Sequence, residues 1–127
     1  MLKLSDQFLD VFKKLYADHR FGDIVIHWVK DDELLEMNRR FLNHNYYTDI
    51  ITFDYSRGKK ISGELFISED RVRENAKKEI TPFNQELDRV IAHGVLHLLG
   101  FKDKTDKEQK EMRLKEDQFL KELYHGS

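Results

Sequence analysis

The 127-residue sequence contains no cysteine, which excludes disulfide bonds, thiolate metal sites and a cysteine nucleophile. Any metal ion in this protein must therefore be held by histidine or carboxylate side chains. Proline is also scarce: Pro82 is the only one, and no low-complexity stretch or internal repeat divides the chain. We therefore expect a single domain over residues 1–127.

Long apolar runs are missing as well. No segment approaches the roughly 20 apolar residues that cross a bilayer, and the first residues lack the apolar centre of a secretion signal. We therefore expect a soluble, cytoplasmic protein without membrane contacts. The formal charge is −2 overall but +3 over residues 39–78. This uneven distribution is consistent either with a face that binds a polyanion or with an ordinary solvated surface.

With 39% apolar residues, the chain can bury a hydrophobic core. Hydrophobic periodicity and capping signals predict an α/β (α+β) fold, with three strands in a small mixed sheet flanked by helices. The segment from Val90 to Leu99 is apolar nearly all round, so its helix should be central and buried, and Gly100 is placed to end it. The expected helices are residues 5–17, 31–42, 68–79, 82–99 and 106–123, and the expected strands are 22–29, 50–55 and 61–68.

Three ionisable residues near the end of this central helix form a candidate metal site. His93 and His97 are four residues apart, about 40° around a helix axis, so both imidazoles can reach one ion. Asp103, just beyond the turn at Gly100, would complete a tripod that leaves one position open for water, as in catalytic zinc sites. An ion held in this way lowers the pKa of its water toward ~7.

Other interpretations of these residues remain open. Two histidines at this spacing can instead be bound by backbone carbonyls, with Asp103 as a turn residue. A zinc metalloprotease also carries paired helical histidines, but its general base is a glutamate at the position that Gly94 occupies here. This substitution counts against peptide hydrolysis by the usual route.

The segment from His93 to Asp103 resembles the signature His-Gly-x-Leu-His-Leu-x-Gly-Tyr-Asp-His of the YbeY-like endoribonucleases, a metal-dependent family. The resemblance extends over most of the chain and its separate motifs occur in the right order. The matching positions are Met37–Asn38, Thr48–Phe53 (family Thr-Asp-Val-Leu-Ser-Phe), Gly63–Ser68 (family Gly-Asp-Ile-x-Ile-Ser), and Met112 and Glu116 in the last helix.

This resemblance implies a metal-dependent endoribonuclease that cleaves single-stranded RNA in ribosomal RNA maturation and ribosome quality control. It implies one divalent ion, zinc, bound by His93, His97 and Asp103, and as partners ribosomal RNA and the ribosome or its small subunit. It also implies a four-stranded mixed sheet, so residues 1–4 supply either a stub of the fourth strand or nothing.

Two positions depart from the family pattern. Asp103 stands where the family has its third metal-binding histidine, and Leu42 stands where it has an arginine thought to contact phosphate. Arg39 or Arg40, one turn earlier, is the candidate substitute for that arginine. These departures leave open a ribosome- or RNA-associated binding module with weak or no catalysis.

Two further RNA-binding candidates, His44 and Thr48, lie near the expected strand 50–55. His44 can donate a proton or stack on a base, although a loop histidine is more often merely solvated. Thr48 can shape the wall of a cleft or simply cap the turn before the strand.

Overall fold

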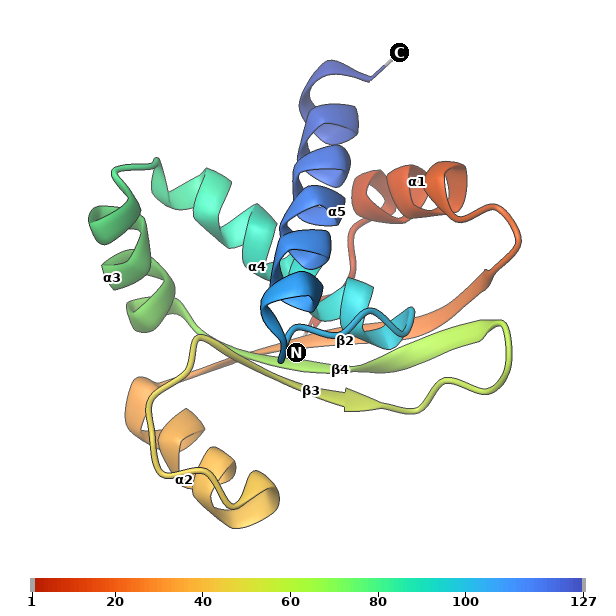
Figure 1. Cartoon of the computed structure of the whole chain (residues 1–127). Coiled ribbons are helices and arrows are strands. Elements are labelled where there is room, and N and C mark those ends of the chain that lie inside the picture. Colours follow the sequence, from red (N-terminus) through yellow and green to blue (C-terminus); the bar gives the residue numbers. More distant parts are fainter. Residues whose placement is uncertain (1, 127) are drawn as a thin grey trace.

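The structure is a computed structural model that describes residues 2–126. Four strands and five helices follow one another along this part of the chain (Figure 1). The elements are β1 (Leu2–Lys3), α1 (Asp6–Leu15), β2 (Arg20–Val29), α2 (Asp31–Leu42), β3 (Ile50–Asp54), β4 (Lys60–Ser68), α3 (Glu69–Glu79), α4 (Phe83–Leu98) and α5 (Asp106–His125). No helix among these residues is long and apolar enough to cross a membrane.

The strands form one mixed sheet in the order β1-β2-β4-β3. β2 and β4 are parallel, whereas β1 pairs antiparallel with β2 and β3 pairs antiparallel with β4. The fourth strand, β1, consists of two residues, Leu2 and Lys3, which pair with Ile26 and Val25. Met1, also part of the expected stub, lies outside the described residues. The predicted fold class is thus confirmed.

The two faces of the sheet carry different layers. Helices α1, α4 and α5 cover one face, and α2 lies against the other (Figure 1). The main core lies on the first face, where Leu65 from β4 packs with Phe12 from α1, Val95 from α4 and Phe119 from α5, all fully buried. Alternate strand residues point into this core because successive side chains of a strand face opposite sides of the sheet.

Most element boundaries follow local capping signals. Thr105 and Glu108 form a capping box at the start of α5: the Thr105 hydroxyl accepts from the Glu108 backbone N–H (3.1 Å) and a Glu108 carboxylate oxygen accepts from the Thr105 N–H (2.9 Å). Strand β2 begins two residues earlier than expected because Arg20 and Phe21 pair with β4. This pairing is between distant segments, so the local pattern does not reveal it.

Candidate metal centre

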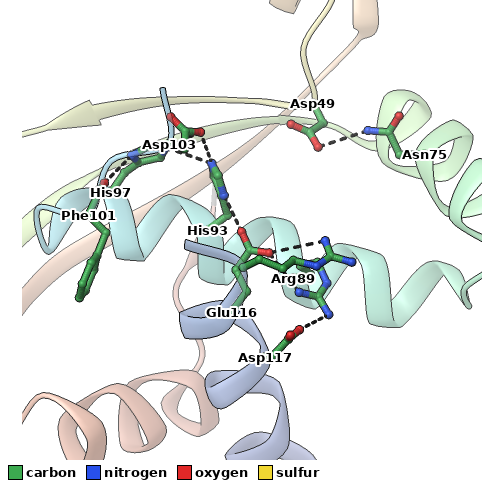
Figure 2. A network of polar contacts seen from close by, with 10 residues as sticks. Asp49, Asn75, Arg89, His93, His97, Phe101, Asp103, Glu116 and Asp117 are labelled. Carbon is green, nitrogen blue, oxygen red and sulfur yellow. Dashed lines mark hydrogen bonds and ion pairs between the residues drawn. The ribbon is translucent and has the colours of Figure 1, made fainter. Parts of the chain in front are cut away.

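Helix α4 carries two histidines on the side that faces away from the hydrophobic core. Its other face fills the core with Val90, Ala92, Val95 and Leu96, while His93 and His97 are half-buried. Gly100 follows the helix at φ 104°, a left-handed conformation that glycine adopts without strain. The chain reverses there, and Asp103 returns alongside the two histidines as the spacing predicts (Figure 2).

The three side chains meet at one point. His93 Nε2 lies 3.0 Å from His97 Nε2, and Asp103 Oδ2 lies 3.1 Å from His93 Nε2 and 3.2 Å from His97 Nε2. Ligand atoms around a tetrahedral zinc ion with bonds of 2.0–2.1 Å stand roughly 3.3 Å apart. The three atoms therefore have the spacing that one small divalent cation requires.

The other nitrogen of each imidazole is already engaged. His97 Nδ1 donates to the backbone carbonyl of Phe101 (2.9 Å), which can only accept. His93 Nδ1 lies 2.7 Å from the Glu116 carboxylate (Figure 2). In the neutral imidazoles, both Nε2 atoms are then lone-pair acceptors that face each other and the Asp103 oxygen. Three converging acceptors repel one another unless a cation or added protons lie between them, so the site fits a bound metal ion.

The surroundings of His93 are acidic. Burial alone lowers the pKa of His93, but the hydrogen bond and charge of Glu116, with the charges of Asp103 and Asp49, raise it above its ordinary value overall. Burial raises the pKa of Asp49, although the charge of His93 and a hydrogen bond from Asn75 (3.3 Å) act in the opposite direction. This excess of negative charge around two imidazoles favours a cation.

Gly94 explains the close packing of α4 on the sheet. A Cβ atom at this position would lie 2.8 Å from Ile50 Cδ1 and 2.9 Å from Leu65 Cδ2, far inside normal contact distance. The residue thus faces the sheet and leaves no room for the glutamate of a zinc protease. This geometry disfavours the metalloprotease interpretation.

Two adjoining cavities are lined by members of the candidate metal triad, which consists of His93, His97 and Asp103. The first, of about 500 Å³, is lined by His93, His97 and Asp103 and also by His44 and Thr48. The second, of about 590 Å³, shares His44, Thr48 and Asp103 and extends toward Tyr46. The metal triad therefore opens into a wide cavity rather than a closed structural site. Leu42 and Lys104 line both cavities.

The predicted RNA-binding residues divide into two groups. His44 and Thr48 line the cavities, where the His44 ring stacks on Tyr46 and Thr48 Oγ1 donates to the Ile50 carbonyl (3.3 Å). Thr48 therefore combines the two interpretations, cavity wall and turn cap. Arg39 and Arg40 are exposed on α2 and line neither cavity, and the Arg39 guanidinium contacts Asn45 and Glu36. Their role as a substitute for the family arginine stays a prediction.

Three residues beside the metal triad were not predicted as site residues. Lys104 lines the cavities, and its position directly after Asp103 is the sequence signal that points to it. Glu116 matches a family position but has no other sequence signal, and Arg89, which contacts it, has none. Both lie on helices whose pattern gives no indication that a charged pair is buried there.

The mixed sheet, the central histidine helix and the three converging side chains describe an α/β protein with a candidate site for a divalent cation. The family model described as "Endoribonuclease YbeY" matches residues 1–124. A relative of that name from Phocaeicola vulgatus is 52% identical over 101 residues, which are 80% of this chain and 73% of the relative. One from Cytophaga hutchinsonii is 59% identical over 91 residues, which are 71% of this chain and 64% of the relative.

A solved structure is also similar. The solution structure of TM1509 from Thermotoga maritima aligns with a TM-score of 0.65 at 30% identity, covering 94% of this chain and 77% of the other. The fold, the motif order and these relatives agree. The chain belongs to the YbeY endoribonuclease family.

Proposed function

We propose that this protein is a metal-dependent endoribonuclease that cleaves single-stranded ribosomal RNA during its maturation. The observation that carries the proposal is the convergence of His93 Nε2, His97 Nε2 and Asp103 Oδ2 within 3.2 Å of one another at the wall of an open cavity. Membership of the YbeY family supports RNA as the substrate. We further infer that the ion is zinc, that the enzyme acts with the ribosome or its small subunit, and that it works in the cytoplasm.

His93, His97 and Asp103 would hold the ion. When bound, it supplies a Lewis acid that acidifies a water molecule and stabilises negative charge on a phosphoryl oxygen. The carboxylate of Asp103 adds a negative charge to the ligand set and so should weaken this acidifying effect relative to a third histidine.

The cavity walls would position the RNA. Lys104, exposed beside Asp103, provides a positive charge for a phosphate, which anchors the backbone without reading its sequence. His44 stacks on Tyr46 at a centroid distance of 5.1 Å, and this pair offers a flat surface on which an unpaired base can stack. Asn38 keeps the pair in place, because its buried amide donates to the Tyr46 carbonyl (2.9 Å). A preference for unpaired strands follows from such stacking.

The metal site is tested first by elemental analysis of protein purified without chelators. We expect about one zinc ion per chain in the wild type and none in His97→Ala. His125→Ala, at the exposed end of α5, is the matched control and should keep its zinc. Equal zinc in wild type and His97→Ala would contradict the assignment of the site.

Activity is tested with a single-stranded ribosomal RNA fragment and with the same fragment annealed to its complement. Zinc-loaded wild type should cleave the single strand faster than the duplex, and His93→Ala should cleave neither. An intact single strand together with tight RNA or ribosome binding would instead favour a binding module, the alternative that Leu42 and Asp103 suggest.

A further inference from the structure

A chain of contacts between four charged or polar side chains leads from the surface to the metal triad. Asp117 Oδ1 lies 2.8 Å from Arg89 Nη2, Arg89 Nη1 lies 3.1 Å from Glu116 Oε1, and Glu116 Oε2 lies 2.7 Å from His93 Nδ1 (Figure 2). The chain joins α5 to α4, since Glu116 and Asp117 belong to the first helix and Arg89 and His93 to the second.

The centre of this chain is buried. The Glu116 side chain is 7% exposed and that of Arg89 is 13% exposed, whereas Asp117 is half-exposed. A buried carboxylate without a partner is costly, and Arg89 supplies the partner. Each oxygen of Glu116 therefore has its own contact: Oε1 faces Arg89, with Arg113 farther off at 3.9 Å, and Oε2 faces His93.

We propose that Glu116, held by Arg89, is a positioning residue that keeps the proton of His93 on Nδ1 and presents Nε2 to the divalent ion. This inference rests on the proposed metal centre. Glu116 is not itself a ligand, because it contacts the opposite nitrogen of the ring and does not belong to the cluster of His93, His97 and Asp103. A carboxylate that accepts from a ligating imidazole fixes the tautomer and the ring orientation and makes the nitrogen that binds the metal more basic.

The two histidine rings are thus held in place by different kinds of group. His97 is held by the main-chain carbonyl of Phe101, which no side-chain substitution removes. His93 is held by a side chain from another helix, 23 residues away in sequence. Packing of α5 against α4 therefore controls one of the three metal ligands, and a substitution at Glu116 should affect the metal without altering the ligands themselves.

The zinc dissociation constant tests this proposal, measured by competition with a chromophoric chelator. We expect zinc to bind about 10-fold more weakly to Glu116→Gln, which keeps a hydrogen-bond acceptor but loses the charge, and up to about 100-fold more weakly to Glu116→Leu. Glu111→Gln is the matched control: it removes the charge of an exposed carboxylate on the same helix, outside this chain of contacts, and should bind zinc like the wild type. Equal dissociation constants for wild type and Glu116→Leu would overturn the proposal.

Thermal unfolding of the metal-free proteins separates positioning from a structural role. A purely structural Glu116 would lower the Tm of the metal-free variants and leave the zinc dissociation constant unchanged, which would also overturn the proposal. If Glu116→Leu does not fold, the nitrogen-15 spectrum of zinc-loaded wild type decides. Zinc on His93 Nε2 with a proton on Nδ1 supports the proposal, and zinc on Nδ1 refutes it.

These results are independent of the proposed nuclease activity. If zinc-loaded wild type does not cleave RNA but the Glu116 variants bind zinc more weakly, the proposed nuclease activity is wrong and the proposed positioning role of Glu116 stands. If RNA is cleaved but all variants bind zinc equally, the positioning role is wrong and the activity stands.

Discussion

Substitution of Gly94 by alanine tests how closely α4 must approach the sheet. The new Cβ would lie 2.8 Å from Ile50 Cδ1 and 2.9 Å from Leu65 Cδ2, whereas carbon atoms in good contact are ~3.5–4.0 Å apart. The helix or the two side chains must therefore move by about 0.7 Å or more. Such overpacking costs about 1–3 kcal/mol, and the better helix propensity of alanine offsets about 1 kcal/mol of it.

We therefore expect Gly94→Ala to lower the free energy of unfolding by about 1 kcal/mol, measured by urea denaturation of the metal-free protein. Ile50→Val removes the Cδ1 methyl that the new Cβ would meet, so the double variant should recover part of the loss in a double-mutant cycle. If Gly94→Ala were instead more stable than wild type by the full gain in helix propensity, the tight approach of helix and sheet would be refuted.

Three further substitutions test other features. Ile80 ends α3 at φ 54° with 91% of its surface exposed, so Ile80→Gly should raise the free energy of unfolding in urea by about 0.5–1 kcal/mol, and an unchanged value would argue against strain there. Because burial raises the pKa of Asp49, its ionised carboxylate destabilises the folded state, and Asp49→Asn should be more stable in urea than metal-free wild type at pH 7. That advantage should shrink as the pH falls through the raised pKa and vanish below the ordinary value of 3.8; an advantage independent of pH would exclude this cause. Lys104→Gln should weaken RNA binding and reduce the slope of log affinity against log salt by about 1, whereas an unaltered slope would remove Lys104 from the RNA contacts.

The parts of the fold that depend on local signals could be predicted from the sequence. Helix α2 runs from Asp31 to Leu42 as expected, since its acidic first turn lies just before a clear amphipathic pattern. The convergence of His93, His97 and Asp103 was predictable for the same reason, because all three residues lie within one helix end and the turn that follows it. That they bind a metal ion stays a prediction.

The parts of the fold that depend on pairing between distant segments could not be predicted from the sequence. Strand β1 has only two residues, which is too short for any periodicity, and its place in the sheet comes from pairing with Val25 and Ile26. The contact between Glu116 and His93 likewise depends on how α5 crosses α4, which the sequence of neither helix specifies. Arg89 was missed because charged residues on a helix are usually solvated.

The three candidate metal ligands lie close together in the sequence, and this closeness affects when an ion can bind to the polypeptide. His93, His97 and Asp103 span eleven consecutive residues, so the unfolded polypeptide already contains the whole chelating segment. An ion that also binds the denatured ensemble stabilises the native state by less than its native affinity alone would give. If these residues bind a divalent ion as proposed, the ion should be able to load during synthesis, as soon as this segment leaves the ribosome, and to help nucleate the helical turn that holds it.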